Sequence, residues 1–157
     1  MDECEPLIEC SLPVQEAPIS PEGIEYKFLQ SSVYGSLQGT YQNLTNNQPN
    51  SPGAATSSEN PQWMQAEFPC AVNVTRILLG APTGPGFVEG GWASVHYIEG
   101  KQIQFSNDGN NWEIALEKIA NISTSGTSEV RLPSPTNAKF WRITSSSYIA
   151  IGCLIFK

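Results

Sequence analysis

The sequence predicts an all-β fold, an antiparallel β-sandwich or jelly roll of about eight strands. Its apolar segments are short, and several alternate apolar with polar residues, which is the period of a strand with one buried face. The chain also holds 13 glycines and 12 prolines, spread along its 157 residues, and these favour many turns. We find no segment with convincing helical periodicity. The length suits one domain with a hydrophobic core.

The clearest expected element is a β-hairpin around residues 107–110. Residues 102–106 alternate polar and apolar side chains, as a strand with one buried face does. The Asn-Asp-Gly-Asn sequence that follows tolerates positive φ angles, so we expect a tight turn with Gly109 in the left-handed region. Apolar residues then recur at every second position, at Trp112, Ile114 and Leu116. They predict a second, antiparallel strand in which Trp112 is mostly buried.

The remaining strands are expected at residues 26–30, 62–68, 72–79, 130–132, 139–143 and 148–156. In the second of these, alternation places Met64, Ala66 and Phe68 on the inner face. Residues 72–79 are more continuously apolar, which is typical of a strand in the middle of a sheet.

Two long segments between these strands are expected to be loops. Residues 28–58 carry no charged side chain and are rich in Ser, Asn, Gln, Gly and Thr. We expect them to form ordered loops over one end of the sandwich and to contribute nothing to the core. Residues 80–100 hold six glycines and two prolines among several aromatic residues, so they predict a second long loop.

Charge divides the chain into an acidic arm and a neutral body. Residues 1–25 hold seven acidic residues, four prolines and no Lys or Arg, so either an extended arm or a disordered tail is expected there. Residues 26–157 form the expected sandwich domain and carry eight acidic and eight basic residues. Without a basic stripe the chain does not resemble a nucleic-acid binder. The absence of Lys and Arg from residues 28–58 and 80–98 also disfavours an anionic membrane surface.

The start of the chain lacks the basic and apolar stretches of a secretion signal, and no apolar run reaches about 18 residues. We therefore expect either a cytoplasmic protein or a piece excised from a longer chain, with no membrane span. An extracellular setting stays open, because the chain contains three Asn-x-Ser/Thr sequences, at Asn43, Asn73 and Asn121.

The four cysteines do not have the spacing of a metal site. Cys4, Cys10, Cys70 and Cys153 form no Cys-x-x-Cys pair, and the one histidine, His96, is distant from them in sequence. We expect no metal and no cofactor, although backbone carbonyl groups could still hold a calcium ion. Cys70 and Cys153 lie in apolar, strand-like surroundings and are expected to be buried free thiols. A disulfide that involves Cys4 or Cys10 stays open.

Several sequence landmarks occur in the order found in the discoidin family, also called coagulation-factor C-type or galactose-binding-like domains. They are the Ser-Ser-Val-Tyr segment at 31–34, the strand at 61–68, Val-Thr-Arg-Ile at 74–77, Trp92, the hairpin at 106–112, Phe-Trp-Arg-Ile at 140–143 and the closing strand at 148–156. The chain resembles this family over residues 26–157. It departs from the extracellular members, because Cys153 lies inside the last strand and not at its end.

The resemblance implies a binding module without catalytic chemistry, and the sequence contains no nucleophile elbow. Carbohydrate is the first expected ligand, because the long loops combine aromatic with neutral hydrogen-bonding side chains. The candidate ligand-binding residues are Tyr34, Tyr41, Asn43, Phe87, Trp92, His96 and Tyr97. For Trp92 and Tyr97 the alternative is a role in capping the core, and for His96 an ordinary surface position. The alternative function is protein recognition within a larger intracellular assembly such as a ubiquitin ligase; the ligand and the oligomeric state stay open.

Overall fold

The computed structural model describes residues 25–35, 37–45, 54–57, 61–81, 97–123 and 127–157, without the side chain of Asn43. These residues form eight strands and one short helix, α1 (Tyr41–Thr45). The strands are β1 (Lys27–Gln30), β2 (Ala54–Ala55), β3 (Gln62–Gly80), β4 (Gln102–Ser106), β5 (Glu113–Leu116), β6 (Thr127–Ser145), β7 (Ala150–Ile151) and β8 (Cys153–Phe156). All the strand pairs are antiparallel, which confirms the predicted antiparallel all-β sandwich.

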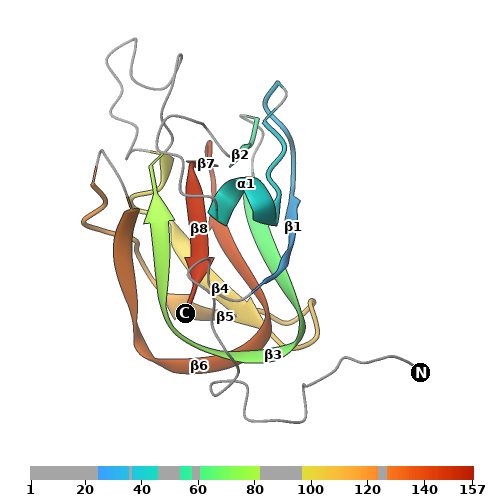
Figure 1. Cartoon of the computed structure of the whole chain (residues 1–157), viewed down its shortest axis with the longest axis vertical. Helices are drawn as coiled ribbons and strands as arrows, with labels where there is room; N and C mark the ends of the chain where they lie inside the picture. The colour runs from blue at the N-terminus through green and yellow to red at the C-terminus, as the bar shows by residue number, and fades with distance from the viewer. Residues whose placement is uncertain (1–24, 36, 46–53, 58–60, 82–96, 124–126) are drawn as a thin grey trace.

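Two long strands, β3 and β6, organise the sandwich. Each is 19 residues long, and they pair with each other almost throughout. Both curve through the base of the molecule and turn back, so each strand contributes to both layers (Figure 1). One layer has the order β1-β3-β6-β4-β5, while β8 pairs with the last residues of β3 in the other. The sequence had predicted two separate strands for each of these segments.

The bends coincide with interruptions of the β3–β6 pairing. The register shifts between Glu67 and Val72, where Pro69 lies, and again between Val74 and Arg76. Opposite the second shift, β6 carries Pro133 and Pro135. Proline has no N–H to donate to a ladder, so strands tolerate it where pairing is interrupted. We call the end of the sandwich that holds these bends the bend end, and the opposite end the loop end.

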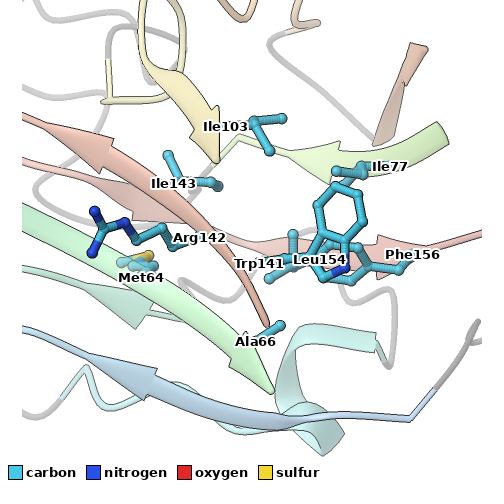
Figure 2. A pocket seen from close by; sticks show the side chains of 9 residues that line it. All are labelled: Met64, Ala66, Ile77, Ile103, Trp141, Arg142, Ile143, Leu154 and Phe156. Atoms are coloured by element: carbon cyan, nitrogen blue, oxygen red, sulfur yellow. The ribbon is translucent and has the colours of Figure 1, made fainter. Parts of the chain in front are cut away.

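The core lies between the two layers and is rich in aromatic rings. Met64, Ala66 and Phe68 are buried on the inner face of β3, as alternation predicted. Phe156 packs between Phe68 and Trp141, with ring centroids 5.3 and 5.9 Å away. Met64, Ala66, Trp141 and Phe156 are among the side chains that line a cavity of about 10 Å³, and Figure 2 shows this lining. A void of that size holds at most one water molecule, so this cavity offers no space for a ligand.

The charge-free segment 28–58 contributes to the core, contrary to expectation. Leu44 and Ala54 are fully buried, and Ala55 is nearly so. Leu44 lies in α1, a single helical turn that packs against β8. These apolar residues stand singly or in pairs among polar ones, so neither periodicity nor an apolar run indicated their burial. The expectation of an all-loop segment without core residues was therefore wrong.

The hairpin is confirmed in its strands and its turn. Gly109 has φ 80°, and the Asp108 carboxylate accepts hydrogen bonds from the backbone N–H groups of Asn110 and Asn111, both at 2.8 Å. These bonds, with the side-chain bonds from Asn111 and Ser106, hold the pKa of Asp108 well below its usual value.

The expected burial after the turn, from Trp112 along β5, was wrong. Trp112 is only partly buried, Ile114 is 49% exposed, and Ala115 is the buried residue. The pairing shifts between Ile103↔Leu116 and Gln104↔Ile114, which leaves Ala115 as an extra residue in a β-bulge. The bulge reverses the alternation, so Ile114 shares the outer face with Gln104.

The turn makes a testable prediction. Replacing Gly109 with valine is expected to lower the free energy of unfolding by about 1 kcal/mol or more, because a β-branched residue is strained at positive φ. Space is not the cause, since an added Cβ would lie 3.5 Å or more from the nearest ring atoms of Phe140. Gly109→Asn is the matched control, because asparagine tolerates this region better. Equal melting temperatures for wild type and the valine variant would contradict the turn assignment.

The two described cysteines differ in state. Cys153 is a buried free thiol, as expected, and burial raises its pKa to about 11. Cys70 was also expected to be a buried free thiol, but it is disulfide-bonded, and its partner lies outside the described residues. Cys70 is only partly buried and follows Pro69 at the bend end, where β3 leaves its ladder with β6.

The part of the chain that the structure describes contains no helix long and apolar enough to cross a membrane.

Candidate functional site

Several connections between strands lie at the loop end. The register pairs Gln30 with Met64, Gln62 with Ser145, and Gln102 with Thr144. The end of β1, the start of β3, the end of β6 and the start of β4 therefore lie at one level. The short β2–β7 pair lies at the same end (Figure 1). Side chains from four separate loops can thus meet here.

Three tyrosines form the main feature of this end, and we call them the tyrosine cluster: Tyr34, Tyr97 and Tyr148. The ring of Tyr148 lies edge-to-face with both others, at centroid distances of 6.5 Å to Tyr34 and 6.4 Å to Tyr97. Tyr34 is 56% exposed and Tyr148 is 41% exposed. Tyr97 is partly buried and packs on Ala55 and Ala150. The cluster therefore presents aromatic surface to solvent on a supported base.

The backbone around the cluster is held by hydrogen bonds to β2 and its neighbours. The Tyr34 N–H donates to the Ala55 carbonyl at 2.9 Å, and the Leu37 N–H donates to the Tyr34 carbonyl at 3.0 Å. Near Tyr148, the Ile149 N–H donates to the Thr56 hydroxyl at 2.9 Å, and the Thr56 N–H donates back to the Ile149 carbonyl at 2.8 Å. Both exposed tyrosines are thus fixed relative to the same short strand.

Neutral polar side chains lie at the same end. Ser31 donates to Gln62 Oε1 at 2.9 Å, and the Ser57 N–H donates to the Ser32 hydroxyl at 2.9 Å. These hydroxyl and carboxamide groups add hydrogen-bonding capacity without charge.

One cation, Lys101, also belongs to the loop end. It is buried, and its ammonium donates to the Ser147 hydroxyl at 3.4 Å. Burial lowers the pKa of Lys101, because the charged form loses hydration.

The structure brings together two of the seven residues expected from the sequence, Tyr34 and Tyr97. Tyr41 instead packs on the core, edge-to-face with Tyr26 at 5.0 Å. Asn43 belongs to α1, and its side chain lies outside the described part. The remaining candidates, Phe87, Trp92 and His96, lie outside the described residues.

Sequence reasoning missed Tyr148, Ser147 and Lys101. Tyr148 was assigned to the closing strand, because an apolar run follows it. The structure places it in the loop before β7. A usable signal was present: residues 145–148 read Ser-Ser-Ser-Tyr, which repeats the Ser-Ser-x-Tyr pattern at 31–34. Both copies end in an exposed tyrosine of the cluster.

No group of three or more His, Cys, Asp or Glu side chains within the described ranges is arranged to hold a metal ion. The groups identified above at the loop end are aromatic rings, hydroxyls and carboxamides, together with the buried ammonium of Lys101. Such a set can bind a molecule but has no paired acid and base for catalysis.

Comparison with known proteins shows which solved structures share this fold. No family model matches the sequence, and no curated protein matches it. Solved structures do match: the CBM32-5 module of Clostridium perfringens, in complex with GalNAc-β-1,3-galactose, superposes with a TM-score of 0.65 at 16% identity, covering 87% of this chain and 96% of that one. The chain has the fold of a carbohydrate-binding module.

Two further solved structures share this galactose-binding-like fold. A fucose-binding module of Streptococcus pneumoniae, SpX-3, has a TM-score of 0.64 at 11% identity and covers 88% of this chain and 98% of that one. A pectin-binding module has a TM-score of 0.61 at 17% identity, with coverages of 83% and 88%. At such identities the similarity concerns the fold.

Proposed function

We propose that this chain is a non-catalytic carbohydrate-binding module of the discoidin, or galactose-binding-like, type that holds its ligand on the tyrosine cluster. The observation that carries the proposal is the contact of Tyr148 with both Tyr34 and Tyr97 at the loop end. The solved modules of the same fold support it, since they bind GalNAc-β-1,3-galactose, fucose and pectin.

The chemistry of the cluster suits a sugar. A pyranose ring has apolar C–H faces, which stack on aromatic rings, and hydroxyls, which need hydrogen-bonding partners. Tyr34 and Tyr148 offer rings and phenol groups, while the serine and glutamine side chains beside them exchange hydrogen bonds. The backbone bonds to β2 order both loops before the ligand arrives, so binding costs less conformational entropy.

Protein recognition within an intracellular assembly is the competing function. The disulfide of Cys70 favours an oxidising compartment, where such bonds persist, over the cytosol. We therefore propose that the module works outside the reducing cytosol. That setting suits glycan recognition better than membership of a ubiquitin ligase.

The test is the affinity of Tyr148→Ala for the best hit of a glycan array. Loss of the central ring is expected to weaken binding by about 1–3 kcal/mol, or roughly 5-fold to 150-fold. Tyr148→Phe keeps the ring and is expected to retain most of the affinity. Raising the salt concentration is expected to change binding of a neutral sugar little.

Two outcomes would contradict the proposal, and melting curves serve as the control for folding. Equal affinities for wild type and Tyr148→Ala would remove the tyrosine cluster from the site. An array without any hit, together with partner proteins captured from a lysate, would favour the competing function. Melting curves of both variants show whether the fold survives, which is expected because Tyr148 is 41% exposed.

A further inference from the structure

The outer face of the β1-β3-β6-β4-β5 layer, away from the core, holds a second group of interacting side chains. The register aligns one row across all five strands: Leu29, Gln65, Arg142, Gln104 and Ile114. In Figure 2 the guanidinium of Arg142 extends away from the rings of Trp141 and Phe156. The row therefore places one cation among neutral side chains.

Arg142 is held in one orientation by two contacts. Its guanidinium carbon lies 3.9 Å from the centroid of the Trp112 ring, and its Nε donates to Gln104 Oε1 at 2.7 Å. Gln104 is fixed in turn, because its Nε2 donates to Gln102 Oε1 at 2.6 Å. Stacking and hydrogen bonding together pre-organise the planar fork of an arginine.

The two terminal nitrogens of Arg142 have no hydrogen-bond or ion-pair partner among the described residues. The arginines of the other layer differ, since Arg76 and Arg131 both contact the Glu129 carboxylate, at 3.3 and 2.7 Å. Arg142 is also partly buried. A partly desolvated cation without a counter-charge costs free energy, which a bound anion would offset.

We propose that this outer face is a second binding site, for a sugar unit that carries a carboxylate, with Arg142 as the carboxylate receptor. The free edge of the guanidinium matches the two oxygens of a carboxylate. Gln65, directly opposite Arg142 on β3, supplies a carboxamide for neighbouring hydroxyls. The site lies on the side of the sandwich and is separate from the tyrosine cluster.

Charge favours an isolated acidic sugar over an acidic peptide or a polyanion. Arg142 is the one cation of its row, and Glu67 stands one row away, opposite Lys27. The whole chain has a net charge of −7, which repels a densely charged partner. A uronic-acid residue carries a single carboxylate among hydroxyls, which fits one guanidinium among glutamines.

The test compares a uronic-acid trisaccharide with the neutral trisaccharide of the same linkage. Wild type is expected to bind the acidic probe in a salt-dependent manner, and Arg142→Gln is expected to bind it about tenfold to a hundredfold more weakly. Arg131→Gln is the matched control, because it removes an arginine that already has a carboxylate partner. Arg131→Gln is expected to leave the affinity for the acidic probe unchanged.

A second measurement uses wild type alone, so its result does not depend on whether a variant folds. In NMR titrations the acidic probe is expected to shift the Trp112 indole signal, and the neutral probe is not. Unchanged affinity in Arg142→Gln, or equal binding of both probes at Trp112, would overturn the second site. Loss of acidic-probe binding in Tyr148→Ala but not in Arg142→Gln would place the carboxylate at the loop end. The proposed function fails independently, if no neutral glycan binds the tyrosine cluster.

Discussion

Replacing Trp141 with alanine is expected to lower the free energy of unfolding by about 3–5 kcal/mol. Trp141 is fully buried, and its ring lies 5.9 Å from Phe156 on the opposite layer and 5.8 Å from Phe105. Its indole N–H donates to the Ala138 carbonyl at 3.1 Å. The truncation removes the largest fully buried side chain among the described residues, enlarges the cavity of Figure 2 and leaves that carbonyl without its donor.

Urea unfolding, followed by far-UV circular dichroism, measures the effect. Trp63→Ala is the matched control, because Trp63 is in the same layer but is only partly buried. The free energy of unfolding is expected to fall clearly less in Trp63→Ala than in Trp141→Ala. Similar losses in both variants would mean that the layers do not pack around Trp141 as described.

Alkaline pH is expected to destabilise the fold between pH 9 and 11. Burial raises the pKa of Cys153 to about 11 from 9.0, so the folded state keeps a proton that the unfolded chain releases. The stabilisation that the protonated Cys153 thiol contributes is complete below pH 9 and is lost as the pH rises to the pKa of the folded state. It amounts to roughly 1–3 kcal/mol. Burial, with Cys153 and Tyr41 nearby, also raises the pKa of Tyr26, which acts in the same direction.

The measurement is the free energy of unfolding at pH 8 and at pH 11, in wild type and in Cys153→Ala. The alanine variant has no thiol to titrate, so its loss between the two pH values is expected to be smaller. Equal losses would assign the alkaline transition to Tyr26 or to other groups. Tyr26→Phe distinguishes these, although it also removes the 2.7 Å hydrogen bond to the Leu154 carbonyl.

Local sequence patterns predicted where strands occur more accurately than they predicted where each strand begins and ends. Alternation correctly placed Met64, Ala66 and Phe68 in the core, because β3 is regular there. It failed after the hairpin, because one extra residue at Ala115 reverses the faces and a bulge leaves no clear mark in composition. The sequence predicted two strands, 62–68 and 72–79, on either side of Pro69, because a proline at a bend looks the same in sequence as a proline in a loop.

The proposed binding surfaces were predictable only in part. Tyr34 stands in a polar loop, and its exposure follows from that setting. Tyr148 was assigned to the closing strand because apolar residues follow it. The serines that precede it repeat those that precede Tyr34 and could have indicated a loop. The stack of Arg142 on Trp112 joins a residue of β6 to the residue just before β5, and β5 and β6 do not pair with each other. Alternation can assign a residue to a face, but it cannot say which distant side chain lies beside it.

The bends in β3 and β6 also determine the orientation in which the domain can be attached to a surface. Lys27 is paired with Glu67 beside the first bend, and Lys157 hydrogen-bonds to Thr75 and Arg76 near the second. Both ends of the described sandwich are therefore remote from the tyrosine cluster. A tether joined at Lys157 would leave the tyrosines pointing into solution. Immobilised on a sensor chip in that orientation, the domain would keep its loop end free to capture analyte, with the outer face of the layer accessible from the side.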